Sequence, residues 1–224
     1  MDILNIMLKD HQIDNLTITE YEKTNIYVIK DVFDEIFCNN LINLMDKSKQ
    51  EKLSFSNHNN VECFSIQNFD HPEIKDKIIT KFLQIFKTFE KLINGLNITS
   101  FSMFELRKVY GITRNHTDGI FGEIIKHPVD NALLKTIRVA TIVIALNDDF
   151  DDGIYNFPTQ NIQIKLKQGS AILFPPYWTH PHGVSKIKEN QHRYILSSWA
   201  LCDNIVIQQQ NAELNNIVIL KDNK

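Results

Sequence analysis

The sequence predicts an α+β fold that is mainly β, with supporting helices placed before a β-rich core. Two observations carry this prediction. A helical pattern of apolar residues is confined to the first part of the chain, and short β-rich runs dominate from about Ile98 onward. These runs alternate with turn-like stretches such as NDDFDDG and KQG, at the spacing of roughly ten residues that is typical of an all-β sandwich or barrel.

The region before residue 98 supplies the expected helices. A β-rich run over residues 25–33 precedes residues 34–48, where apolar side chains recur at helical spacing. Residues 71–95 give the strongest helix signal, with Pro72 suited to the first turn and Gly95 to the end. The apolar residues of this second helix form one stripe, which we expect to face the core.

Length and composition indicate one domain rather than several. The chain has 224 residues, of which 43% are hydrophobic, enough for a sizeable core. We expect three parts: residues 1–97 as helical support with the first strands, residues 98–203 as the β core, and residues 204–224 as an extension. That extension is either an added edge strand or a partly loose tail.

The net charge and the cysteine content limit the binding partners and the cellular compartment that we expect for this protein. The net charge of −3 lacks the excess of basic residues that is typical of nucleic-acid-binding domains. We therefore expect no nucleic acid as a binding partner. No stretch approaches the run of about 18 apolar residues that spans a bilayer. The three cysteines are widely spaced, which favours free thiols in a reducing compartment and a cytoplasmic location.

One short motif in the β half has metal-binding chemistry. In RNHTDG, His116 and Asp118 are separated by one residue. In an extended segment these two positions share a face, so an imidazole and a carboxylate converge on one ion. A second histidine from a distant strand completes a facial triad, which leaves coordination positions open and is typical of non-heme Fe(II) oxygenases. Alone, the motif is more often a surface turn than a metal site.

An ordered series of further motifs strengthens this interpretation. RVATIVIALN, DDFDDG, YNFP, KQGSAILFPP, HPHGV and HRYILSSW follow the His-x-Asp pair in that order. From about residue 102 to 203, the sequence resembles the Fe(II)/2-oxoglutarate dioxygenases, specifically their prolyl 4-hydroxylase-like branch. The resemblance implies a double-stranded β-helix, or jelly-roll, for the core.

The resemblance also implies the catalytic residues. His116, Asp118 and His182 correspond to the iron ligands, and Arg193 corresponds to the residue that pairs with the far carboxylate of 2-oxoglutarate. A guanidinium suits such a carboxylate because it offers a planar pair of donors. His180, two residues before His182 in HPHGV, is expected to be a bystander or to support the ligands from behind.

Further pocket residues follow from the same comparison. Tyr110 and Thr141 correspond to side chains that line the co-substrate pocket, and Arg138 to a basic residue at its mouth that contacts substrate. Ala145 stands where many members have a tyrosine that touches the far carboxylate. Trp199 is expected to pack rather than react.

The resemblance therefore implies an enzyme that uses Fe(II), 2-oxoglutarate and O₂, with ascorbate as a further candidate, and releases succinate and CO₂. Asp118 favours hydroxylation, since related halogenases replace this carboxylate. Residues 119–136 are expected to cover the iron and to select the substrate, which the resemblance suggests is a prolyl residue of a peptide or protein. Three alternatives stay open: a dioxygenase of free amino acids or other small molecules, a non-catalytic jelly-roll scaffold, and a cupin-like metalloenzyme that uses no keto acid.

Overall fold

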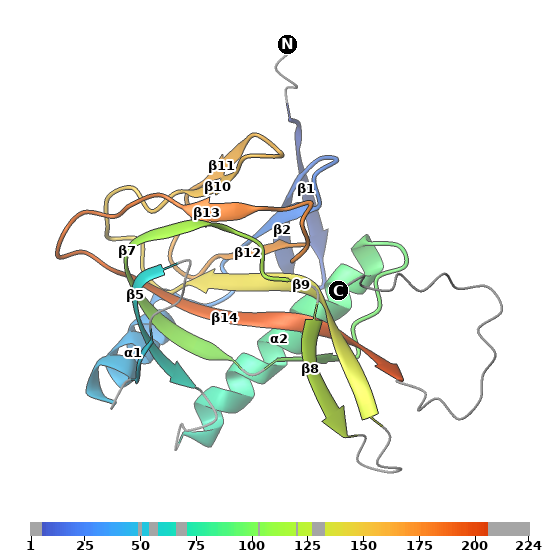
Figure 1. Ribbon diagram of the computed structural model, residues 1–224, viewed down its shortest axis with the longest axis horizontal. Coiled ribbons are helices and arrows are strands. Elements are labelled where there is room, and N and C mark those ends of the chain that lie inside the picture. The colour runs from blue at the N-terminus through green and yellow to red at the C-terminus, as the bar shows by residue number, and fades with distance from the viewer. Residues whose placement is uncertain are drawn as a thin grey trace, which may run out of the picture.

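The computed structural model describes residues 6–48, 51–53, 58–65, 71–102, 104–119, 121–126 and 133–205. Within these ranges the chain forms antiparallel strands and two helices (Figure 1). The elements, in chain order, are β1 (Leu8–Ile13), β2 (Leu16–Tyr21), β3 (Ile26–Lys30), α1 (Glu35–Lys47), β4 (Glu51–Leu53), β5 (His58–Ser65), α2 (Pro72–Leu92), β6 (Ser100–Phe101), β7 (Glu105–His116), β8 (Phe121–Lys126), β9 (Leu133–Ala145), β10 (Tyr155–Phe157), β11 (Ile162–Ile164), β12 (Ala171–Phe174), β13 (His182–Val184) and β14 (Arg193–Ile205).

Both helices expected from the apolar pattern are confirmed. Asp34 caps α1, because its side chain accepts a hydrogen bond of 2.7 Å from the backbone N–H of Phe37. Pro72 occupies the first turn of α2, where a missing N–H costs nothing. Asp46, near the end of α1, accepts hydrogen bonds from the Tyr194 hydroxyl at 2.7 Å and from the Lys108 ammonium at 3.0 Å. These contacts fix α1 to β14 and β7.

The strand order confirms the mainly β jelly-roll prediction. The hydrogen-bonded path runs β1-β2-β3-β12-β9-β14-β7-β13-β10-β11, and its pairings are antiparallel. The long strand β7 pairs with β14 through its first half and with β13 through its last residues. It therefore joins two layers: β10, β11 and β13 lie on one side of β9 and β14, and α2 lies on the other (Figure 1).

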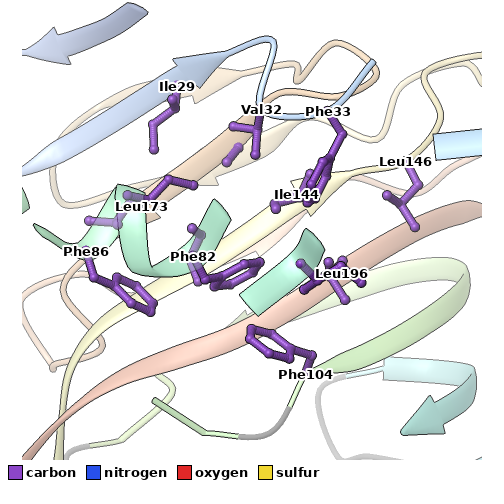
Figure 2. Packing of buried hydrophobic residues seen from close by; sticks show 14 of the residues in the cluster. Ile29, Val32, Phe33, Phe82, Phe86, Phe104, Ile144, Leu146, Leu173 and Leu196 are labelled. Atoms are coloured by element: carbon purple, nitrogen blue, oxygen red, sulfur yellow. The ribbon is translucent and has the colours of Figure 1, made fainter. Parts of the chain in front are cut away.

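Two clusters of buried side chains lie on opposite faces of the central sheet. In β9, Ile142 and Ile144 face the helices, whereas Val143 and Ala145 face the interior between the layers. Figure 2 shows the helix side, where Phe82 of α2 packs near Phe104 with a ring separation of 4.5 Å. Because both faces of the last part of β9 are buried, residues 142–145 are continuously apolar rather than alternating.

Two features differ from the boundaries expected from sequence or add to them. The hairpin of β1 and β2 carries no strong pattern of its own and was not expected. Through β3, which pairs with β12, this hairpin extends the core sheet. At the other end, β14 continues to Ile205, two residues beyond the expected core boundary. The remainder of the expected C-terminal extension lies outside the described residues.

Within residues 119–136, β8 pairs with the start of β9. The side chains expected to cover the iron lie outside the described ones, so that role stays a prediction. Cys38 and Cys202 are free thiols, and the side chain of Cys63 lies outside the described ones. In the described part of the chain, neither helix has the length and apolar character needed to cross a bilayer.

Candidate metal centre

The register of β7 and β13 sets two histidines opposite each other. His182, the first residue of β13, pairs directly with His116, the last residue of β7. Gly183 allows the close approach of the strands, because a Cβ at that position would lie 2.9 Å from the backbone oxygen of Thr113. A glycine within the Pro-His-Gly-Val motif is therefore part of how the site is built.

The three expected metal ligands converge on one point. The Nε2 atom of His116 lies 3.4 Å from Oδ1 of Asp118, and the Nε2 atom of His182 lies 3.9 Å from the same oxygen. All three candidate ligand atoms lie within 4.8 Å of one another. Two imidazoles and one carboxylate on one side of a pocket are the donor set of the facial triad. The residues present therefore fit an Fe(II) ion.

Both imidazoles are held in the tautomer that a metal requires. Nδ1 of His116 lies 2.8 Å from the backbone oxygen of Arg114, and Nδ1 of His182 lies 3.0 Å from that of His180. A carbonyl oxygen only accepts, so Nδ1 carries the proton and the lone pair of Nε2 faces the cluster. Burial lowers the pKa of His182, which favours the neutral, ligating form.

Asp118 is oriented by side chains from two other strands. Its Oδ2 atom accepts hydrogen bonds from the Thr141 hydroxyl of β9 and, at 3.2 Å, from Nε1 of Trp199 on β14. Oδ1 is left facing the histidines. Burial opposes ionisation, but contact with His116 and His182, when these imidazoles are protonated, and the two donors Thr141 and Trp199 together hold the pKa of Asp118 well below its usual range. The carboxylate is therefore ionised and ready to bind a cation.

A buried arginine lies in the same pocket. Arg193, 3% exposed, donates to the Tyr155 hydroxyl at 3.3 Å and to the Thr113 hydroxyl at 2.9 Å. Among the described residues no carboxylate pairs with this guanidinium, and its Nε atom has no hydrogen-bond partner. A buried cation with neutral partners is costly unless an anion joins it. The site therefore fits the carboxylate of a 2-oxo acid whose other end reaches the metal ligands.

The structure separates the two histidines of HPHGV as expected. His180 turns away from the cluster: its Nε2 lies 2.6 Å from the backbone oxygen of Thr24, and its Nδ1 lies 2.9 Å from the Thr179 hydroxyl. Only its backbone oxygen takes part, by holding His182. His180 thus supports a ligand from behind without being one.

The other predicted residues have mixed outcomes. Thr141 lines the pocket, and Trp199 does more than pack, since both donate to Asp118. Arg138 donates to the backbone oxygen of Asp118 at 2.6 Å and lies over the Trp199 ring at 4.0 Å, so it supports the ligand loop. Its contact with substrate stays a prediction. Tyr110 is not among the described residues that line this pocket: its ring lies beside that of His192, with centroids 5.5 Å apart, and Arg107 lines the pocket from β7, so the role of Tyr110 stays a prediction.

Several pocket residues were missed by sequence reasoning. The described lining also includes Arg107, Thr113, Tyr155, Val184, Ile195 and Ser197. Two of these had a readable signal, because counting in steps of two from Arg193 along a strand gives positions 195, 197 and 199. Tyr155 had none, since the segment that holds it reads as a variant turn.

Fold and site together define a jelly-roll oxygenase of the Fe(II)- and 2-oxoglutarate-dependent type. Residues 109–201 match the family model described as the 2OG-Fe(II) oxygenase superfamily, and this range contains all three candidate ligands and Arg193. The matched range therefore carries the sequence pattern of this superfamily's catalytic core, as the motifs predicted. The superfamily's cofactor set is Fe(II) with 2-oxoglutarate and O₂. No curated protein matches the sequence significantly.

Several solved structures with a similar fold are described as prolyl hydroxylases. The viral collagen prolyl hydroxylase from Paramecium Bursaria Chlorella virus-1, in its 2OG complex, is 21% identical with a TM-score of 0.57, covering 81% of this chain and 98% of its own. A Trichoplax adhaerens prolyl hydroxylase in complex with a hypoxia inducible factor peptide fragment is 14% identical with a TM-score of 0.61, covering 80% and 84%. A Pseudomonas putida prolyl-4-hydroxylase is 13% identical with a TM-score of 0.55, covering 80% and 92%.

Proposed function

We propose that this protein is an Fe(II)- and 2-oxoglutarate-dependent hydroxylase that acts on a prolyl residue of a peptide or protein. One observation carries the proposal: the convergence of His116, Asp118 and His182 in a pocket that also contains the buried cation Arg193. The alternative of a non-catalytic scaffold is disfavoured, because a scaffold has no need to bury an arginine that pairs with no carboxylate in the part of the chain that the structure describes.

Each side chain has a distinct task in this proposal. His116, Asp118 and His182 hold the metal from one side, leaving the pocket side open. When bound, iron and 2-oxoglutarate supply the oxidation that inserts an oxygen atom from O₂ into a C–H bond, with release of succinate and CO₂. Arg193 binds the far carboxylate of the 2-oxo acid and fixes its direction. Val143 and Ile195 line the pocket with apolar groups that limit access of water.

A prolyl substrate is supported by the proteins that share the fold. The viral protein is named a collagen prolyl hydroxylase, and the Trichoplax protein is described in complex with a peptide. We extend this substrate class to the present chain, with Arg138 at the edge of the ligand loop as a candidate contact. The cytoplasmic location stays an expectation.

The metal and co-substrate assignment is tested by a spectroscopic titration under anaerobic conditions. Fe(II) together with 2-oxoglutarate should give a weak visible charge-transfer band in the wild-type protein. His182→Ala should abolish the band. His180→Gln is the matched control, two residues away and equally buried, and should keep it. No band in the wild type, or a band that survives His182→Ala, contradicts the iron assignment.

The substrate assignment is tested separately by succinate release. The wild-type enzyme should release succinate above its uncoupled background with proline-rich peptides, and the peptide should gain 16 Da, the mass of one oxygen atom, as expected for hydroxylation. Replacing the candidate prolines with alanine is the control. Stimulation by free amino acids alone, with no effect of any peptide, would favour the small-molecule alternative.

A further inference from the structure

We propose that Arg107 and Ser197 form a subsite for a carboxylate of the primary substrate, apart from the place of Arg193 in the same pocket. The proposal rests on the proposed function, because it narrows the substrate class of the same site. Arg107 of β7 pairs with Ile195 of β14, and Ser197 follows two residues later on the same face of β14. The side chains of Arg107 and Ser197 both line the metal pocket.

The hydroxyl of Ser197 is a buried polar group that lacks a partner. The residue is 4% exposed, and its Oγ atom has no hydrogen-bond partner among the described residues. A buried hydroxyl normally makes a hydrogen bond, because leaving it unpaired costs free energy. Ser197 lines the pocket together with the three candidate metal ligands. A polar atom of a molecule bound in this pocket would complete the hydrogen bonding of Ser197.

Arg107 brings a positive charge to the same wall of the pocket. Its Nε atom donates to Glu105 at 2.8 Å, but the Glu105 side chain is 36% exposed, so water screens the compensating negative charge. Burial raises the pKa of Tyr155, and the charges of Arg193 and Arg107 oppose that shift. Both guanidiniums therefore act on one pocket interior.

The position of Arg107 favours the primary substrate over 2-oxoglutarate as the source of the anion. Its guanidinium carbon lies 5.7 Å from the centre of the Trp199 ring, and Nε1 of Trp199 donates to Asp118 at 3.2 Å. Arg107 therefore lies near the metal end of the pocket. In the loaded site, Asp118 and the doubly charged 2-oxoglutarate balance the charges of the iron and of Arg193. Arg107 adds a charge beyond that balance, which a substrate carboxylate would offset.

The subsite therefore selects a carboxylate close to the carbon that is oxidised. In a peptide, this group is the side chain of an aspartate or glutamate next to the prolyl residue. In a small molecule, it is the carboxylate of a free amino acid. A guanidinium binds a carboxylate more strongly than a neutral amide, so the amide counterpart of either substrate should be disfavoured. We take the peptide as the source, in line with the proposed function.

The test measures how strongly the protein prefers an acidic peptide over its amide counterpart. Labelled peptides that differ only in a glutamate or a glutamine beside the proline are titrated into protein loaded with 2-oxoglutarate and with Mn(II) in place of Fe(II), and fluorescence anisotropy reports binding. The wild type should bind the glutamate peptide about tenfold more tightly, as for one hydrogen bond to a charged group. Arg107→Gln should reduce this preference to less than about twofold and leave binding of the glutamine peptide unchanged. Ser197→Ala should reduce it about threefold.

Two further substitutions on β7 are matched controls. Glu105→Gln removes the carboxylate that competes for Arg107 and should increase the preference for the glutamate peptide about threefold. Lys108, the next residue along the strand, faces the opposite side and donates to Asp46. Lys108→Gln should therefore keep the wild-type preference, although it removes the same charge from the same strand.

The outcomes separate this proposal from the proposed function. Equal binding of the two peptides by the wild type, or an equal loss of both in Arg107→Gln, overturns the subsite and leaves the prolyl assignment in place. Free proline and prolinamide are compared in the succinate assay. Succinate release that needs free proline, is not produced by prolinamide and is lost in Arg107→Gln, with neither peptide bound, supports the subsite and overturns the peptide substrate.

Discussion

Gly183→Ala should weaken metal binding as well as destabilise the fold. The added Cβ would lie 2.9 Å from the backbone oxygen of Thr113, where ordinary contact begins at 3.4 Å. Nearby backbone atoms of Asn115 and Arg114 lie at 3.2 and 3.3 Å from the same point. Because these are main-chain atoms of β7, no rotamer change relieves the contact. The two strands must separate by about half an ångström beside the paired histidines.

The expected sizes follow from that displacement. Overpacking of this kind costs about 1–3 kcal/mol of stability, so the variant should fold with a lower melting temperature. Metal sites tolerate shifts of only about 0.2 Å in ligand position. We therefore expect the Kd for Mn(II) or Fe(II) to rise about 10- to 100-fold, as for disturbed support of a ligand. Metal titration and thermal unfolding measure the two quantities on the same sample.

Gly95→Ala is the control for a general loss of stability. Gly95 follows α2 with φ of +83° and open space around its Cβ position, so alanine there adds backbone strain far from the ligands. It should lower the melting temperature and leave the metal Kd unchanged. If Gly183→Ala lowers the melting temperature but keeps the wild-type metal Kd, the close approach of β7 and β13 does not position the ligands.

Three further variants test other parts of the structure. Thr141→Val removes a hydrogen-bond donor to Asp118 at nearly constant side-chain volume and should raise the metal Kd about tenfold. Thr141→Ser keeps the hydroxyl and should restore the wild-type Kd. Equal Kd values for the wild type and both variants would contradict the role of the Thr141 hydroxyl. Phe82→Ala, in the helix-side core, should cost about 3–5 kcal/mol in urea unfolding, and a cost below 1 kcal/mol would refute its packing role. Asp46→Asn should cost about 1 kcal/mol at pH 7, given its partial exposure. Partial burial alone would raise the pKa of Asp46, but the hydrogen bonds from Tyr194 and Lys108 hold it below the usual value. The stabilisation that the Asp46 carboxylate provides is therefore present above about pH 4, and it is lost as the pH falls through the pKa of the folded state. The stability difference between Asp46→Asn and the wild type should therefore shrink as the pH falls below about 4, and a difference that stays constant would contradict the assignment.

The metal ligands could be predicted because their signals are local. His116 and Asp118 share a face by simple alternation, and HPHGV offered only two candidates for the third ligand. The helices were equally readable, since α2 has its apolar stripe on one face. The β1–β2 hairpin was not, because its strands are partly exposed and gain their order by extending a sheet formed by distant residues.

The residues of β7 that line the pocket could not be predicted from simple alternation along the strand. In a regular strand, residues three apart face opposite sides, so Thr113 and His116 should not share a pocket. They do, because the pairing of β7 with β13 is irregular between His182 and Val184. That irregularity also prevents a simple count back from His116 to the inward residue of the earlier part of β7, which is Arg107 rather than Tyr110. Alternation fails wherever a bulge interrupts it.

The three ligands differ in what keeps them in place, and this difference predicts where the site is fragile. Each histidine is held by the backbone oxygen of the residue two positions earlier, Arg114 within β7 for His116 and His180, just before β13, for His182. Such contacts depend on the local backbone and not on the identity of neighbouring side chains. Asp118 depends instead on Thr141 and Trp199, side chains supplied by two other strands. Substitutions of Thr141 on β9 or Trp199 on β14 should therefore weaken metal binding by releasing the Asp118 carboxylate from its position, while the two imidazoles keep their orientation.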